Sequence, residues 1–209
     1  MKRSHKKFTL VEILVTISII LVLAGMIMAG VNVVIGKAEK LKAKQGAVNL
    51  ANAVREYKSV YGTLPITRDR SGENDTYRLN DTEYDKLVQI LTNVNGDWVG
   101  CEARNYLDNK DKNDRRNAKK KSFLSPNDRY EELGYVDPWG ERYVIIMDDN
   151  YDGIIVLEDE EGKDKDYRTD VVVYSKGLNG EDNGGLSYGE NAEARTSESG
   201  EEYDDILGW

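Results

Sequence analysis

The stretch that decides the fold, residues 6–26, reads KKFTLVEILVTISIILVLAGM. Two lysines precede a long apolar run that carries one carboxylate, Glu12. No charged residue occurs from Ile13 to Gly36, and a helix of that length rises by about 36 Å, against a bilayer hydrocarbon core of about 30 Å. The run therefore predicts a membrane-spanning helix. Glu12 then needs a partner, because a carboxylate at the centre of such a helix costs about 2.5–3.5 kcal/mol.

The charges before the apolar run predict how the chain is oriented. Basic residues occupy positions 2, 3, 6 and 7, and positive charge favours the cytoplasmic side. We therefore expect a single-pass inner-membrane protein with a cytoplasmic N-terminus and a periplasmic C-terminal domain. The alternative is a cleaved secretory signal. The apolar run is longer than the usual hydrophobic region of such a signal, and no small-x-small site ends it before Lys37.

Composition limits the function classes open to the chain. The formal net charge is −9 over 209 residues, which argues against a nucleic-acid partner and suits divalent cations. Cys101 is the only cysteine and His5 the only histidine. The chain beyond residue 5 therefore has no Ser-His-Asp triad, Cys-His pair or His-ligated zinc site, and we expect no enzyme of these kinds.

The segment FTLVE (8–12), with basic residues before it and an apolar run after it, resembles the prepilin-type signal of type IV pilins and type II secretion pseudopilins. The resemblance implies cleavage between Lys7 and Phe8 by a prepilin peptidase, followed by N-methylation of Phe8. It also implies a filament in which Glu12 meets the α-amino group of Phe8 on a neighbouring copy. These two opposite charges attract strongly in a low dielectric. The alternative is that Glu12 snorkels at the membrane edge.

The helix is predicted to continue past the apolar run as an amphipathic segment. Gly62 and Pro65 are expected to end it after about Tyr61. The chain is thus divided into a leader (1–7), a transmembrane and assembly helix (8–36), its amphipathic continuation (37–63) and a globular domain (64–209). The apolar face of the continuation repeats at three- and four-residue spacing and comprises Ala38, Leu41, Val48, Ala51, Val54 and Tyr57.

The last third of the chain is predicted to form strands. The β-branched runs 142–147, 153–158 and 170–175 are separated by Asp, Asn and Gly, which favours an antiparallel three-stranded sheet. A short helix over 82–91, capped by Asp81 or Thr82, is expected before them. The predicted fold class is α+β: a long N-terminal helix packed on a small antiparallel sheet with a C-terminal loop, as in pilins.

Two C-terminal segments extend the resemblance. DPWGERY (137–143) and VYSKGLNGED (173–182) with DDILGW (204–209) resemble segments of the major pseudopilins of type II secretion. In that family the C-terminal loop binds Ca²⁺. The resemblance implies a ligand set here of Leu178, through its backbone oxygen, with Asn179, Asp204 and Asp205, and Asp182 is an added candidate. The alternative is a disordered acidic tail.

A second candidate calcium loop comes from spacing alone. DDNYDGIIVLED (148–159) fits the pattern Asp-x-Asn-x-Asp-Gly with a carboxylate at the twelfth place. Oxygen ligands at that spacing suit Ca²⁺, and the glycine permits a sharp bend. The alternative is a β-hairpin turn rich in turn-forming residues. The candidate ligands are Asp148, Asn150, Asp152 and Asp159.

Taken together, the patterns predict a structural subunit of a type II secretion pseudopilus that polymerises through its N-terminal helix and supports protein export. The implied partners are further copies, other pseudopilins, the inner-membrane secretion platform and the prepilin peptidase. The alternatives are a minor pilin of a type IV pilus, a membrane-anchored calcium-binding adhesin, and a membrane-anchored hydrolase that uses paired carboxylates.

Overall fold

The chain has the α+β composition that the sequence predicts, with a long N-terminal helix and a small antiparallel sheet. It divides into two compact units, 1–39 and 40–209, which are taken separately below. The computed structural model describes residues 9–66, 76–103, 106–108, 116–127, 129–158, 164–182, 195–196, 202–203 and 206–208, with backbone alone for 27–33 and a few strand positions.

Helix α1 (Leu10–Tyr61) is the longest element and contributes to both units. It ends where the sequence predicts. The N–H of Gly62 donates to the carbonyl of Lys58 at 2.8 Å, and Gly62 adopts a φ of 75°. A residue without a Cβ takes this left-handed conformation without steric cost, so glycine terminates the helix here.

The prediction of a membrane-spanning helix is wrong. Among the residues that the structure describes, no helix combines the length and the apolar character that crossing a membrane requires. The expected single-pass inner-membrane location, with the C-terminal domain in the periplasm, is corrected accordingly.

The main sheet has four antiparallel strands in the order β1-β2-β5-β8. Its register pairs Ile145 with Val173 at the centre and Ser175 with Ile206 at the edge. The strands are β1 (Thr76–Arg78), β2 (Val144–Asp148), β5 (Val171–Ser175) and β8 (Ile206–Leu207).

The run 153–158 does not join this sheet, contrary to the sequence prediction. It forms β3 (Ile155–Glu158), which pairs antiparallel with β4 (Asp164–Tyr167) as a separate two-stranded ribbon. Strand β2 already pairs with β1 along one edge and β5 along the other, so no edge of β2 is left for β3. A third small sheet pairs β6 (Arg195–Thr196) with β7 (Glu202–Tyr203).

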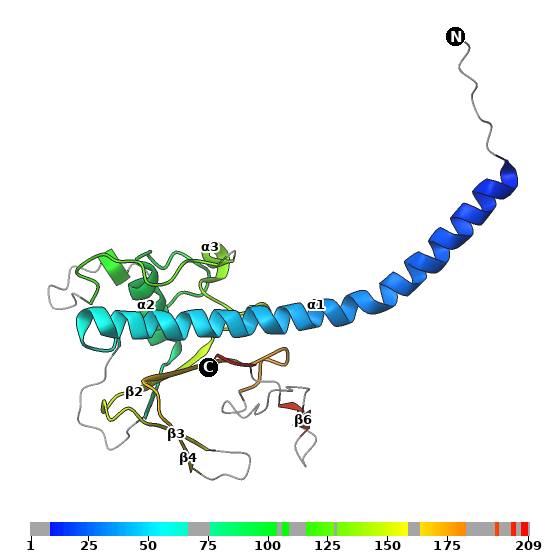
Figure 1. Cartoon of the computed structure of the whole chain (residues 1–209). Coiled ribbons are helices and arrows are strands. Elements are labelled where there is room, and N and C mark those ends of the chain that lie inside the picture. Colours follow the sequence, from blue (N-terminus) through cyan, green and yellow to red (C-terminus); the bar gives the residue numbers. More distant parts are fainter. Residues whose placement is uncertain are drawn as a thin grey trace. The chain divides into compact units, whose positions relative to one another are not determined.

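The core of the C-terminal unit forms around the later turns of α1 (Figure 1), which share one buried cluster with residues of α2 (Asp81–Thr92), β2 and β5. The buried stripe of α1 matches the predicted one at Ala51, Val54 and Tyr57 but differs from it nearer the start. Leu41, expected in the core, is 69% exposed, whereas Ala43 is fully buried. The stripe comprises Ala43, Ala47, Leu50, Ala51, Ala53, Val54 and Tyr57.

Both faces of the main sheet are covered, which explains why its central strands are apolar throughout. Successive side chains of a strand point to opposite faces. Ile145 and Met147 belong to the core shared with α1, while Val144 and Ile146 pack in a second cluster with Ile155 of β3. The β3–β4 ribbon therefore covers the face of the sheet that α1 does not.

Helix α2 (Asp81–Thr92) begins at a cap that the sequence analysis misplaced. Asn80, rather than Asp81 or Thr82, is the N-cap residue. Its side chain accepts from the Glu83 N–H at 3.0 Å, and the Glu83 carboxylate accepts from the Asn80 N–H at 3.0 Å. This reciprocal capping box satisfies two N–H groups that the helix cannot pair internally. The two remaining short helices are η1 (Tyr106–Asp108) and α3 (Tyr130–Leu133).

Gly46 offers a test of how closely the sheet approaches α1. A Cβ at this position would collide with the phenol of Tyr143, and the Tyr135 hydroxyl donates to the Gly46 carbonyl at 3.2 Å. We expect Gly46→Ala to lower the free energy of unfolding by about 1–3 kcal/mol through overpacking, despite a helix-propensity gain of about 1 kcal/mol. Urea denaturation followed by tryptophan fluorescence measures the change.

Gly36→Ala is the matched control, since a Cβ at Gly36 meets nothing within 4 Å. It gains the same helix propensity without a collision and should leave the unfolding midpoint unchanged or slightly raised. Equal effects of the two substitutions would contradict the close approach at Gly46.

Candidate functional site

The first turn of α1 contains a capping box that the sequence analysis missed. The Glu12 N–H donates to the Thr9 hydroxyl oxygen at 3.2 Å, and the Thr9 N–H donates to Glu12 Oε2 at 3.4 Å. The pattern Thr-x-x-Glu ahead of an apolar run is the sequence signal for this arrangement. A carboxylate is also favourable at a helix N-terminus because of the helix dipole. Glu12 therefore has a local role within its own chain.

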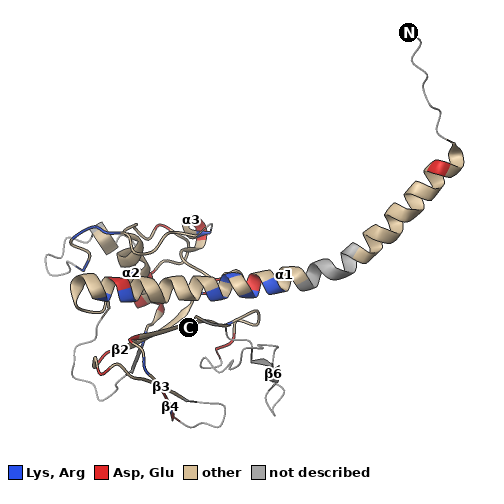
Figure 2. Ribbon diagram, in the orientation of Figure 1, with Lys and Arg blue, Asp and Glu red and all other residues tan. Residues whose placement is uncertain are grey.

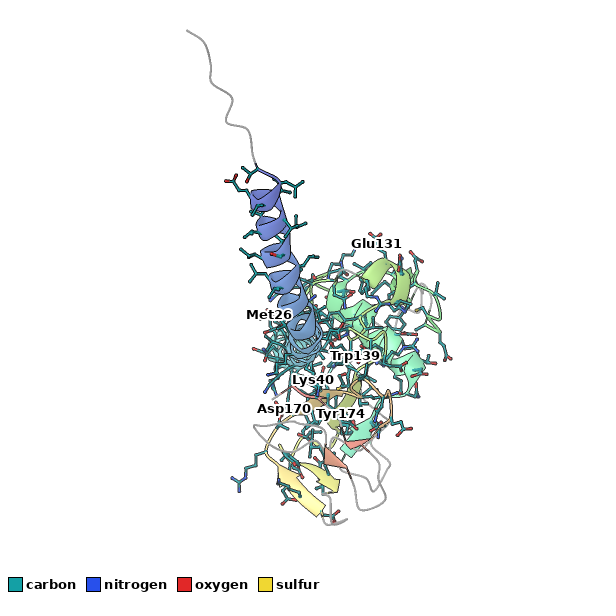
Figure 3. The ribbon with its side chains drawn as sticks, turned by 90° about the vertical axis from the view of Figure 1, so that its right-hand side faces the viewer. Met26, Lys40, Glu131, Trp139, Asp170 and Tyr174 are labelled. Atoms are coloured by element: carbon teal, nitrogen blue, oxygen red, sulfur yellow. The ribbon has the colours of Figure 1, made fainter. Side chains whose placement is uncertain are left out.

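The segment Leu10–Met26, called the apolar segment below, is exposed along its whole length. Leu10 is 81% exposed, and Leu21 and Met26 are each 70% exposed. The side chains of this segment project from all sides of the ribbon (Figure 3). Figure 2 shows a single acidic residue near its start and no other charge along it. A contiguous exposed apolar surface of this kind marks an interaction site.

The hydroxyl groups of the apolar segment are paired within the helix. The Thr16 hydroxyl contacts the carbonyls of Glu12 and Ile13 at 2.9 and 2.8 Å, and the Ser18 hydroxyl donates to the Val15 carbonyl at 2.8 Å. Ser and Thr commonly bond back to the preceding turn of a helix in this way. Burying this surface against another helix thus leaves these hydroxyl groups satisfied.

A buried corner, formed by Asp137, the backbone of residues 139–141 and Ser175, joins the two C-terminal segments that carry the family resemblance. Asp137 is 1% exposed. Its Oδ1 accepts from the N–H groups of Trp139, Gly140 and Glu141 at 2.9–3.0 Å, and its Oδ2 accepts from the Ser175 hydroxyl at 2.6 Å. Burial raises the pKa of Asp137, an effect that these hydrogen bonds partly offset.

The end of the chain reaches the same corner. Tyr174 and Ser175 of β5 pair with Leu207 and Ile206 of β8. Ile206 and Leu207, the described strand residues of DDILGW, therefore lie beside the part of VYSKGLNGED that contacts Asp137 of DPWGERY. This convergence was not readable from the sequence, because it depends on which strands become neighbours.

The predicted C-terminal calcium set is only partly within the described residues. Leu178, Asn179 and Asp182 lie in the turn that follows β5. The Asp182 carboxylate accepts from the Tyr174 hydroxyl at 2.8 Å and pairs with Arg78. The side-chain oxygen of Asn179 accepts from the Glu181 N–H at 2.8 Å. Asp182 thus has structural partners, and calcium binding at this loop remains a prediction.

Several predicted site residues lie outside the described part of the chain. They are the processing pair Lys7 and Phe8, the C-terminal pair Asp204 and Asp205, and Asp159, the twelfth residue of the second calcium pattern. Among the residues described, no group of three or more His, Cys, Asp or Glu side chains gathers in a metal-binding arrangement.

The second calcium pattern forms the connection between β2 and β3. Gly153 donates its N–H to Asp148 Oδ2 at 2.9 Å, and the N–H of Asp152 donates to Asn150 Oδ1 at 2.9 Å. Positive φ values at Tyr151 (63°) and Gly153 (81°) turn the backbone twice. β2 and β3 do not pair with each other, so the turn is not that of a β-hairpin, but the Asn150 and Asp152 side chains accept from backbone N–H groups as turn-forming residues do.

Cys101 is held in a buried polar network that suits a structural role. Asp85, fully buried, accepts from the Arg142 guanidinium at 3.1 Å and from the Glu102 N–H at 2.8 Å. Burial, helped by the neighbouring Asp85 charge, raises the pKa of the Cys101 thiol to about 11. At neutral pH the thiol is therefore protonated and weakly nucleophilic.

Comparison with protein-family models, with curated proteins and with solved structures finds no match for this chain. Its function therefore rests on the residues and contacts described above.

Asp137 provides a test of the corner. We expect Asp137→Ala to lower the free energy of unfolding by about 2–4 kcal/mol, since it leaves buried N–H donors and the Ser175 hydroxyl without their acceptor. Asp137→Asn keeps an acceptor oxygen in place and should cost less. Chemical denaturation at neutral pH compares the two variants with the unaltered chain.

Glu141→Ala is the control, since its carboxylate is half exposed and its contacts in the corner are made by its backbone N–H and carbonyl. It should change the unfolding free energy by less than about 0.5 kcal/mol. If Asp137→Ala proved equally mild, the corner would not stabilise the fold as described.

Proposed function

We propose that this protein is a filament subunit of the pseudopilin class, which assembles through the apolar segment and supports protein export by type II secretion. The observation that carries the proposal is the exposure of an apolar helix surface from Leu10 to Met26. Its partners in the proposal are further copies of the chain, other pseudopilins and the secretion platform.

The distribution of apolar side chains favours several helical neighbours over one. A helix that is apolar on one face needs one partner surface, whereas a helix that is apolar all round is stable only when it is enclosed. The exposed large apolar residues of the segment follow one another closely enough to cover every side of the helix: Leu10, Val11, Ile13, Leu14, Val15, Ile17, Ile19, Ile20, Leu21, Val22, Leu23 and Met26. A bundle of the same helix from several copies would enclose it.

Burial in such a bundle supplies a large driving force. Covering one Val, Leu or Ile side chain fully is worth about 1.5–3 kcal/mol. Partial burial of a dozen such side chains therefore exceeds the cost of ordering the copies, which is several kcal/mol or more. The internally paired hydroxyl groups of Thr16 and Ser18 add no desolvation penalty of their own.

Glu12 gives the bundle an axial register in this proposal. Cleavage between Lys7 and Phe8 creates a new α-amino group close to the start of α1, and N-methylation preserves its positive charge. Pairing of that group with Glu12 of a neighbouring copy neutralises both charges in a low dielectric, where opposite charges attract strongly. Apolar contacts alone allow neighbouring helices many axial positions of similar energy, whereas one charge pair favours a single axial position.

The globular unit supports the same class. The two C-terminal segments that resemble the major pseudopilins meet at one corner, where Asp137 accepts from Ser175 and β8 pairs with β5. Resemblances scattered by chance along a chain have no reason to converge on one structural feature.

Substitutions at Glu12 and Thr9 separate the two roles of the carboxylate. Glu12→Gln keeps a side chain that can bond back to Thr9 but removes the charge, since Gln also serves in capping boxes. Thr9→Ala removes the hydroxyl acceptor and keeps the charge. Glu12→Ala removes both. We expect Glu12→Gln and Glu12→Ala to lose assembly, and Thr9→Ala to retain it.

Assembly can be measured on the full chain produced together with a prepilin peptidase. Ile20→Cys, at a 62% exposed position of the apolar segment, allows oxidative crosslinking between copies, and the buried Cys101 alone serves as the background. A ladder of crosslinked copies is expected. Absence of any Ile20→Cys crosslink would overturn the filament proposal, and normal ladders in Glu12→Gln would overturn the charge pair alone.

A further inference from the structure

We propose that the loop joining β2 to β3 is a Ca²⁺ site built from Asp148, Asn150 and Asp152. This site differs from the C-terminal set that the family resemblance implies. It does not depend on the filament proposal.

The first observation is an unpaired oxygen on a buried carboxylate. Asp148 ends β2 and is fully buried. Its Oδ2 accepts from the Gly153 N–H at 2.9 Å, but its Oδ1 has no hydrogen-bond partner in the described part of the protein. A buried carboxylate oxygen without a partner is costly. A bound cation would supply the missing interaction.

The second observation is where that carboxylate points. The hydrogen bond to Gly153 directs Asp148 across the loop that follows it rather than back into the sheet. In the same loop, Asn150 Nδ2 donates to Asp152 Oδ2 at 2.9 Å, which brings these two side chains together. The six residues 148–153 therefore carry three carboxylates and one amide, of which Asp148, Asn150 and Asp152 stand at alternate positions.

The spacing matches the requirements of a hard cation. In calcium loops the first, third and fifth residues contribute side-chain oxygens, the seventh contributes its backbone carbonyl, and glycine at the sixth place permits the bend. Here the side chains are those of Asp148, Asn150 and Asp152, the glycine is Gly153, and the seventh residue is Ile154. Asp152 is exposed, so water can complete the coordination.

The donor set favours Ca²⁺ over other common ions. All candidate ligands are oxygens, whereas Zn²⁺ favours thiolate and imidazole ligands. Mg²⁺ requires a near-ideal octahedron, whereas Ca²⁺ accepts six to eight oxygens in a flexible arrangement. The two carboxylates supply less charge than a strong site has, so we expect modest affinity.

Binding would have a structural consequence for the β3–β4 ribbon. The loop ends at Ile155, which begins β3 and is fully buried in the cluster that covers the outer face of the main sheet. An ion held by Asp148 at the end of β2 and by the residues just before β3 would fix the ribbon to the sheet (Figure 1).

Calorimetric titration of the EDTA-treated full chain with CaCl₂ tests the site, together with its melting temperature in Ca²⁺ and in Mg²⁺. The titration should reach about 5 mM, to cover weak calcium modules with dissociation constants of about 10⁻⁴–10⁻³ M. We expect one site, a higher melting temperature in Ca²⁺, and a smaller shift in Mg²⁺.

Variants locate the ion. Asp152→Asn, at an exposed residue, and Asp148→Asn should each weaken Ca²⁺ binding at least tenfold. Asp149→Asn, at the second place of the loop, should leave it unchanged. If Asp148→Asn fails to fold, Asp152→Asn still tests whether the ion binds in this loop. No calcium-dependent heat or melting shift, or unaltered binding by Asp152→Asn, would overturn the proposal.

The outcome is separable from that of the filament. Glu12→Gln should bind Ca²⁺ as the unaltered chain does, whatever its effect on crosslinking. Loss of binding in Asp182→Asn with normal binding in Asp152→Asn would move the site to the C-terminal loop and reject the one proposed here.

Discussion

The close packing of the main sheet against α1 is the constraint on which the C-terminal unit depends. Gly46 leaves room for the Tyr143 ring, and a Cβ on Gly208, beside β8, would lie 2.6 Å from the Cβ of Ala47. Small residues on both sides therefore set the separation between helix and sheet. Protein interiors are close-packed, so a single added methyl group at such a contact lowers stability. Larger side chains at these positions would push the sheet away from the helix.

Three carboxylates illustrate how environment assigns a role. Asp137 is buried with both oxygens engaged, by three backbone N–H groups and by Ser175, and it holds a structural corner. Asp148 is equally buried, but one of its oxygens has no hydrogen-bond partner among the described residues, which makes it a candidate ligand. Glu12 is exposed and bonded only to its own helix terminus. Burial and hydrogen-bond completeness, rather than residue type, separate the three.

Helix α1 combines two kinds of surface in one continuous element. Its later turns bury small apolar residues against the sheet and α2, whereas its first turns expose large apolar residues. A helix whose backbone is paired internally can extend without side-chain cover, but large apolar side chains in water favour association. The exposed part is therefore where this protein has most to gain from association.

The sequence by itself determined the features that depend on neighbouring residues. These include the long helix and its end at Gly62, the strands of β2 and β5, and the tight loop at Asp148 to Gly153. Each follows from local backbone preference or from the period of apolar residues. The Thr9–Glu12 capping box was also readable as Thr-x-x-Glu, although it was overlooked.

Only the tertiary structure decided which elements meet. It separated β3 from the main sheet, moved the buried stripe of α1 away from Leu41, and joined Asp137 to Ser175 across 38 residues. It also left one oxygen of Asp148 without a hydrogen-bond partner in the part of the chain that the structure describes, which no spacing of residues could reveal. The physical reason is that burial and pairing depend on contacts between distant segments, and local sequence patterns carry no information about which distant segment will fill a given edge or face.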